Sequence, residues 1–246
     1  MRRVDYDAVA PAFDRRYSHN SYEGIERSLV RFIGAAPLRA VLEVGCGSGH
    51  WLKVLEHTAR MVAGMDLSSG MLRLARQASP RALLVRATAE HLPYRSATFD
   101  RVFCINALHH FSDKREFIRE CRRILPAGGA FLTTALDPHT GLDKWWVYDF
   151  FPASLGADLI RYPSTQQIRD WIIEAGFASA QTELVHHMPA ERSFEVALER
   201  GHLDRRSTSQ LMVISDDEWE RGIRRLHDER PVIRSDLRLF ATIGTL

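Results

Sequence analysis

The sequence has no long hydrophobic run and no excess of charge of one sign. None of its apolar stretches approaches the roughly 18 residues that a membrane-spanning helix needs, and no apolar segment follows the arginines at the N-terminus, as a secretory signal would require. Its 33 basic and 31 acidic residues give a formal charge of +2, which provides no argument for nucleic acid or an anionic membrane as a partner. We therefore expect a cytoplasmic protein without a membrane span, and we do not expect nucleic acid as its partner.

Cysteine is scarce, and no CxxC pair occurs. Cys46, Cys104 and Cys121 are an odd number of widely spaced residues, which argues against a disulfide framework and favours a reducing compartment. The adjacent histidines of the chain have no partner at the spacing of four that helical metal ligands use. We predict that the protein holds no metal ion.

What the sequence does contain is an alternation of helical and strand patterns between residues 20 and 137. Short apolar strands are predicted at 40–44, 61–67, 82–88, 101–108 and 130–136, and two more at 179–187 and 236–244. Strands separated by single helices form parallel neighbours joined by right-handed crossovers. The last two strands flank a charged helical segment and are predicted to form an antiparallel pair. The pattern predicts an α/β, Rossmann-like, doubly wound sheet, which binds its ligand at the carboxyl ends of the strands.

We predict a single domain over residues 1–246, with helical insertions. Its core is expected at about 20–137, 177–189 and 234–246. The segments at about 1–19, 138–176 and 190–232 are expected to form a lid that covers the substrate.

The stretch VLEVGCGSGHW (41–51) places three glycines between a strand and a helix. No lysine follows in the register of a triphosphate-binding loop, and His50 stands where a dinucleotide loop needs its third glycine. Glu43 would repel a pyrophosphate but suits a ligand that carries an ammonium and a sulfonium group. Asp66, at the end of the next strand, can accept hydrogen bonds from both hydroxyls of a ribose. Together these residues favour S-adenosylmethionine.

Four stretches of the chain resemble successive motifs of one family. They are VLEVGCGSGHW, VAGMDLSSGML, ATAEHLPYRSATFDRVFCINALHHF and ECRRILPAGGAFLTTAL, and the resemblance extends over about residues 38–136. In order and spacing they resemble the class I S-adenosylmethionine-dependent methyltransferases, and most closely the small-molecule subgroup that includes the ubiquinone and menaquinone biosynthesis type. The resemblance implies a seven-stranded sheet whose seventh strand is antiparallel and lies between the fifth and the sixth.

The resemblance also implies which residues contact the cofactor, at the ends of the first four strands. They are Glu43, Gly45, Cys46, Gly47, Asp66, Leu67, Met71, Thr88, Ala89, Glu90, Asn106 and Ala107. The chain departs from the family at Thr88, where an aspartate is usual, although the hydroxyl can still accept a bond from the adenine amino group. For Leu67 and Met71 a place in the core is the alternative, and for Thr88 a helix cap.

Methyl transfer is an in-line displacement, for which orientation alone contributes roughly 7–11 kcal/mol. A general base is needed only where the acceptor keeps its proton at neutral pH. His109 and His110 follow the fourth strand and are the candidates for this base. Their alternatives are contact with the substrate or cofactor and a structural role in the loop.

Aromatic residues are dense in KWWVYDFFP (144–152), which favours an apolar or aromatic acceptor; the alternative is a helix packed on the core. The candidate substrate residues are Tyr17, Trp145, Trp146, Tyr148, Phe151 and Arg161. INALHH lacks the Asn/Asp-Pro-Pro-aromatic motif of enzymes that methylate nucleic-acid amino groups. The activity we expect is methyl transfer to a small molecule. A catalytically silent cofactor-binding protein, or an enzyme acting on RNA or protein, is the alternative, and the sequence does not identify the atom that is methylated.

Overall fold

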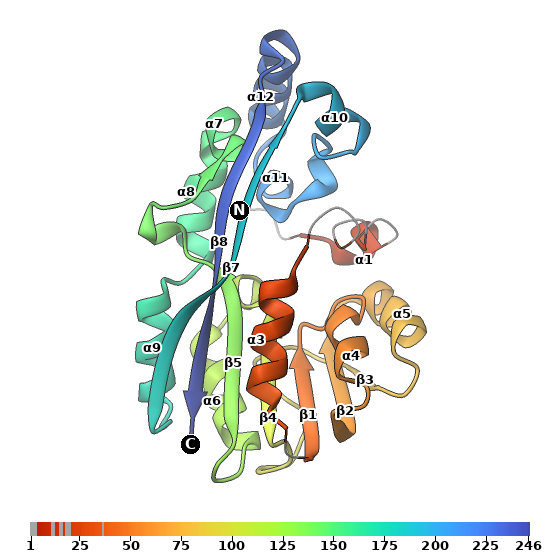
Figure 1. The fold of residues 1–246 in the computed structure, drawn as a ribbon, viewed down its shortest axis with the longest axis vertical. Helices are drawn as coiled ribbons and strands as arrows, with labels where there is room; N and C mark the ends of the chain where they lie inside the picture. Colours follow the sequence, from red (N-terminus) through yellow and green to blue (C-terminus); the bar gives the residue numbers. More distant parts are fainter. Residues whose placement is uncertain (1–3, 11–12, 15–16, 18–20, 36) are drawn as a thin grey trace. The chain divides into compact units, whose positions relative to one another are not determined.

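The strands predicted from the sequence form one sheet in the computed structural model, which describes residues 4–10, 13–14, 17, 21–35 and 37–246. Within these residues the strands are β1 (Leu38–Val44), β2 (Ala59–Asp66), β3 (Leu83–Arg86), β4 (Arg101–Ile105), β5 (Ala130–Leu136), β6 (Lys144–Trp145), β7 (Ser179–Arg192) and β8 (Ile233–Thr245). Their order is β3-β2-β1-β4-β5-β8-β6, and β7 also pairs with β8 (Figure 1). The predicted fold class is confirmed, because β1 to β5 pair in parallel and the last long strand follows β5 in the sheet.

Several details of the sheet differ from the sequence-based expectation. The strand β3 ends at Arg86 rather than at residue 88, and β7 continues to Arg192 rather than ending at residue 187. The strand β6 was not predicted; it has two residues and pairs antiparallel with β8 through Lys144 and Trp145. The fourth strand ends at Ile105 rather than at residue 108. Asn106 takes a left-handed backbone with φ of 51°, and Leu108–His110 then form a 3-10 turn, η2. The apolar residues after Asn106 extend the hydrophobic run but cannot continue the strand through that conformation.

Contacts divide the chain into two compact units. The sheet unit comprises Tyr6–Ala135, Thr165–His186 and Leu239–Leu246, and the insertion unit comprises Leu136–Ser164 and His187–Arg238 with Val4 and Asp5. The division differs from the expected one in two places that were predicted as lid and that cluster with the sheet unit: residues 165–176, and the described residues from Tyr6 onward of the segment 1–19. Whether the insertion unit acts as a lid stays a prediction.

Six helices of the described part of the sheet unit connect or flank the strands: α1 (Tyr6–Val9), α3 (Glu23–Ile33), α4 (His50–Leu55), α5 (Ser69–Ala78), α6 (Lys114–Ile124) and α9 (Thr165–Glu174). The helices α3, α4 and α5 contact one another in succession, and α6 contacts α9. Ser68 caps α5 and Asp113 caps α6, each by accepting a backbone N–H three residues later at 3.0 and 2.9 Å. These caps begin both helices directly after the loops that form the candidate site.

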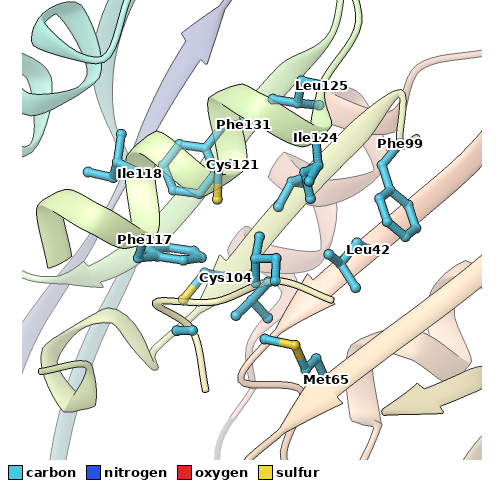
Figure 2. Close-up of a cluster of buried hydrophobic side chains, with 14 of the residues drawn as sticks. Leu42, Met65, Phe99, Cys104, Phe117, Ile118, Cys121, Ile124, Leu125 and Phe131 are labelled. Carbon is cyan, nitrogen blue, oxygen red and sulfur yellow. The ribbon is translucent and has the colours of Figure 1, made fainter. Parts of the chain in front are cut away.

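The core of the sheet unit lies between α6 and the strands. Phe117, Cys121 and Ile124 of α6 are fully buried, and Figure 2 shows them beside Cys104 and Phe131 of neighbouring strands. The strand β1 is buried at nearly every position, as is typical of a parallel strand covered on both faces. Burial of both faces holds this strand in place, and with it the start of the glycine loop that follows.

The insertion unit has an apolar core of its own. Its helices are α7 (Trp146–Phe150), α8 (Pro152–Arg161), α10 (Phe194–Glu199), α11 (Ser209–Met212) and α12 (Asp216–Glu229). Phe151 is fully buried there and stacks on Trp219, with ring centroids 5.3 Å apart. No helix of the described residues is both long enough and apolar enough to cross a membrane.

Two glycines in helices of the insertion unit provide a test of this packing. A Cβ at Gly222 in α12 would lie 2.3 Å from a ring carbon of Phe151, whereas a Cβ at Gly156 in α8 meets no atom within 4 Å. We expect Gly222→Ala to destabilise the protein by roughly 1–3 kcal/mol through overpacking. Gly156→Ala, the matched control, is expected to stabilise it by about 0.5–1 kcal/mol, because alanine favours the helix. Thermal unfolding followed by circular dichroism measures both, and equal shifts for the two variants would contradict the packing described.

Candidate active site

The glycine loop lies between β1 and α4 in the sheet unit. Gly45, Gly47 and Gly49 all have positive φ, at 75°, 51° and 84°, a region that favours glycine. The N–H groups of Gly45 and Cys46 donate to the carbonyl of Met65, at 2.7 and 3.0 Å. A Cβ at position 45 would lie 2.5 Å from the Cβ of Ala107. The loop therefore brings its backbone against the end of β4, as a ligand held by backbone groups requires.

Glu43 lies beneath this loop, in β1. Its carboxylate is 1% exposed, and its Oε2 atom has no hydrogen-bond partner among the described residues. Burial raises the pKa of Glu43 well above its usual value, and the nearby charge of Asp66 raises it further. A positive charge on a ligand would favour the ionised carboxylate. The site is thus suited to the ammonium and sulfonium groups of S-adenosylmethionine.

Asp66 ends β2 and is held by the backbone of two loops. Its Oδ2 accepts the N–H of Gly47 and its Oδ1 accepts the N–H of Ser68, both at 2.9 Å. Burial raises the pKa of Asp66, although these hydrogen bonds act in the opposite direction. Each carboxylate oxygen can accept a second hydrogen bond. Asp66 can therefore hold the glycine loop and still accept the hydroxyls of a ribose.

The residues predicted beside the adenine differ in exposure. Leu67 is 41% exposed, while Met71 is 1% exposed and lies in the core. Thr88 is exposed, and Ala89 is buried. The side chains of Leu67 and Thr88 are thus accessible to a ligand, and that of Met71 is not.

Glu90 has a local partner at the start of α6. Its Oε1 accepts the N–H and the hydroxyl of Ser112, both at 2.8 Å, and the N–H of Asp113 at 3.2 Å. Burial acts to raise the pKa of Glu90, but these hydrogen bonds outweigh it and the pKa lies below its usual value. This carboxylate holds the loop between β4 and α6 in place.

The turn after β4 carries both candidate bases. Asn106 donates its N–H to the carbonyl of Thr134 at 2.8 Å, and its left-handed backbone turns the chain into η2. His109 is buried, whereas His110 is half-buried. The Nε2 of His110 lies 2.6 Å from the hydroxyl of Tyr6, in hydrogen-bond contact. The structure therefore pairs one of the two candidate histidines with a phenol from the N-terminal segment.

The described part of the N-terminal segment packs on the glycine loop and on α5. The carboxylate of Asp7 accepts the N–H of Gly70 at 2.6 Å and the hydroxyl of Ser68 at 2.8 Å. These hydrogen bonds lower the pKa of Asp7. Sequence reasoning missed Asp7, because nothing in the local pattern indicates a partner more than 60 residues away.

Tyr17, a candidate substrate residue, lies over the start of α4. Its ring stacks on that of His50, with centroids 3.7 Å apart and planes within 3°. Nearby, Ser48 donates to the carboxylate of Asp14, and Phe13 lies against Gly47. His50 thus has a structural partner at the position where a dinucleotide loop carries glycine.

The other candidate substrate residues belong to the insertion unit, where they separate into two groups. Trp146 and Phe151 are buried in its apolar core. Trp145 is half-buried and makes an edge contact with Tyr148, at 5.3 Å between centroids. Tyr148 donates its hydroxyl to Asp158 at 2.9 Å, and Arg161 forms an ion pair with the same carboxylate. The structure therefore brings Tyr148 and Arg161 together and places Phe151 out of reach of solvent.

Comparison with known proteins agrees with this geometry. Residues 42–133 match the family described as "Methyltransferase domain". The chain is 30% identical over 146 residues to 27-O-demethylrifamycin SV methyltransferase of Amycolatopsis mediterranei, covering 50% of this chain and 54% of that protein. It is 31% identical over 159 residues to the phthiotriol/phenolphthiotriol dimycocerosates methyltransferase of Mycobacterium tuberculosis, covering 62% and 57%. The chain spans about half the length of the curated relatives it matches.

A solved structure extends the likeness of the fold beyond the matched domain. A protein from Anabaena variabilis, described as a putative methyltransferase from an antibiotic biosynthesis pathway, superposes with a TM-score of 0.66. The two chains are 19% identical, and the match covers 90% of this chain and 96% of the other. At this identity the likeness concerns the fold alone.

The buried carboxylate of Glu43 generates a prediction about pH. Its folded-state pKa lies above the unfolded value, so the stability of the cofactor-free protein falls as the pH rises above about 4.3, through the range in which the unfolded chain ionises this group and the folded protein keeps it protonated. Glu43→Gln removes that dependence. We expect the melting temperature of Glu43→Gln relative to the native protein to increase steadily with pH over this range.

The control is Glu220→Gln, which changes an exposed carboxylate of α12 and should show no such trend. Differential scanning calorimetry at several pH values makes the comparison. A difference between Glu43→Gln and the native protein that is constant with pH would contradict the burial assigned to this carboxylate.

Proposed function

We propose that this chain, whose residues 42–133 match the family described as "Methyltransferase domain", is a class I methyltransferase that uses S-adenosylmethionine to methylate a small apolar or aromatic acceptor. The observation that carries the proposal is the arrangement of Glu43, Asp66 and the glycine loop. The Oε2 atom of the buried Glu43 carboxylate has no hydrogen-bond partner among the described residues. The glycine loop that follows has three glycines with positive φ, and the carboxylate of Asp66 holds that loop from the next strand.

Each of these groups has a separate task in the proposed reaction. S-adenosylmethionine, when bound, supplies a methyl group made reactive by the positive sulfur. Gly45 and Gly47 allow the backbone to approach the methionine portion, and Glu43 balances positive charge there. Asp66 orients the ribose, and orientation is the main source of rate in such a displacement.

The Tyr6–His110 pair supports a route for the acceptor's proton. A proton can move between the Tyr6 hydroxyl and the Nε2 of His110, because the two atoms are 2.6 Å apart. An acceptor hydroxyl close to either atom can therefore lose its proton as the methyl group arrives. His109, which is buried beside His110, is proposed to position that ring rather than to contact the acceptor.

The choice of a small molecule as acceptor rests on two observations. By their names, the two relatives above act on 27-O-demethylrifamycin SV and on phthiotriol or phenolphthiotriol dimycocerosates, which are neither proteins nor nucleic acids. The charge of this chain is also nearly balanced. We keep the ubiquinone and menaquinone type as a proposal about the acceptor, which places quinone precursors in the first screen. We also keep the cytoplasm as the proposed location, because Cys46, Cys104 and Cys121 are all free.

Cofactor binding is the first test. Isothermal titration calorimetry should show that S-adenosylmethionine and S-adenosylhomocysteine bind, and that Asp66→Ala weakens both by about 10- to 100-fold, the effect of losing one or two hydrogen bonds to a charged group. The matched control is Asp217→Ala, which removes an exposed carboxylate of α12 and should leave affinity unchanged. Absence of binding at millimolar cofactor would overturn the proposed function.

The proton route is tested with a phenolic acceptor found in a methyl-release screen over phenols, quinone precursors and amines. We expect His110→Ala and Tyr6→Phe to lower kcat by roughly 100-fold at neutral pH, the usual contribution of a general base. The loss should shrink as the pH approaches about 10, where a phenol ionises without help. His57→Ala, at an exposed histidine, is the control. A loss that does not change with pH would show that the pair only orients the acceptor.

A further inference from the structure

The insertion unit contains a buried arginine whose charge is only partly compensated. Arg161, the last residue of α8, is 5% exposed. Its Nη2 donates to the Oδ1 of Asp158 at 2.5 Å and lies 3.5 Å from the hydroxyl of Ser209. Its Nε and Nη1 are buried and have no hydrogen-bond partner among the described residues. Three N–H donors of a cation are thus shielded from water without an acceptor.

The partner carboxylate is, by contrast, well supplied with donors. Asp158 is fully buried and accepts the hydroxyl of Tyr148 at 2.9 Å in addition to Nη2 of Arg161. Burial raises the pKa of Asp158, while Arg161, Tyr148 and Gln210 act to lower it through charge and hydrogen bonds. The Asp158 carboxylate therefore has hydrogen-bond donors from three residues around it. Only one of the three guanidinium nitrogens of Arg161 donates to it. The imbalance leaves positive potential on the Nε and Nη1 side of Arg161.

The neighbouring acceptors are already engaged. The amide of Gln210 donates to the hydroxyl of Tyr162 at 3.0 Å, and its oxygen accepts the hydroxyl of Thr208. The carbonyl of Tyr162 lies 2.8 Å from the Nε2 of His139. An unpaired donor on a buried charged group costs several kcal/mol, so the acceptor that would complete Arg161 has to come from outside this cluster.

We propose that the insertion unit has a binding site of its own, in which Arg161 binds the carboxylate of an aromatic or apolar carboxylic acid. A guanidinium matches a carboxylate in plane and in spacing of donors. A phosphate would bring a second negative charge close to Asp158, which disfavours it. The rings of Tyr148 and Tyr162 flank the cluster, and an aromatic body suits such surroundings.

Conservative substitutions in the same unit separate recognition from folding. Arg161→Lys keeps a positive charge for Asp158 but removes the donors on Nε and Nη1. Arg205→Lys is the matched control, because all three guanidinium nitrogens of Arg205 already donate within the unit, to Leu211, Asp216 and Ile214. Melting temperatures report whether each variant is folded. If Arg161→Lys does not fold, the pair Asp158→Asn with Arg161→Met replaces it, since that pair removes both buried charges together.

The experiment measures binding of benzoate, 2-hydroxybenzoate and 4-hydroxybenzoate, each against its own amide, by calorimetry on the full chain. We expect at least one acid to bind the native protein about tenfold more tightly than its amide, equivalent to about 1.4 kcal/mol. Arg161→Lys should abolish that preference and leave the amide unchanged, and Arg205→Lys should retain it. If no acid is preferred over its amide at millimolar concentration, or if Arg161→Lys retains the preference, the proposal is overturned.

S-adenosylhomocysteine is titrated into the same samples as an independent readout. Its binding by Arg161→Lys should equal that of the native protein. Loss of cofactor binding by the native protein itself would overturn the proposed function, whereas the comparison of acids with amides does not depend on the cofactor and can be made without it. The two failures are therefore distinguishable.

Discussion

The hydrogen bonds from Gly47 and Ser68 to the carboxylate of Asp66 are the constraint on which the candidate site depends. They join the loop after β1 to the loop after β2, both at 2.9 Å. Ser68 in turn caps α5 and donates its hydroxyl to Asp7. Through Ser68, Asp66 therefore also helps to hold the described start of the N-terminal segment. A single half-buried carboxylate therefore positions two loops, one helix and part of the segment that packs on them.

Much of the sheet unit could be predicted from the sequence for a separate reason. Its strands are apolar runs, and such runs are visible in the sequence, as in AVLEV and AFLTTAL. The glycines of the loop are visible as well, and positive φ favours that residue type. The fourth strand was predicted too long, since the apolar character continues past Asn106 while the backbone does not. The apolar character of a segment predicts that it is buried, but the residue at which a strand ends depends on the local backbone conformation.

The contacts that escaped prediction are those between residues far apart in the chain. Asp7 with Gly70, Tyr6 with His110 and Tyr17 with His50 each join the N-terminal segment to the first turn of a helix or to the turn η2 of the sheet unit. No periodicity marks such pairs, because each depends on the completed fold.

The aromatic run at 144–152 could not be assigned from the sequence for the same reason. Its composition indicated either a substrate surface or a packed helix, and the structure divides it, with Phe151 in the core and Trp145 half-buried.

The ion pair of Arg161 and Asp158 is where the insertion unit departs most from what stability alone would select. The unit already has an apolar core around Phe151 and Leu226, and a well-packed apolar pair in place of the two charges would often be as stable or more so. Desolvating a cation and then leaving two of its nitrogens unbonded adds to that cost. Departures from local consistency are expected chiefly at functional sites. The apolar core would be enough to hold the unit together, whereas binding of a carboxylic acid would need the arginine.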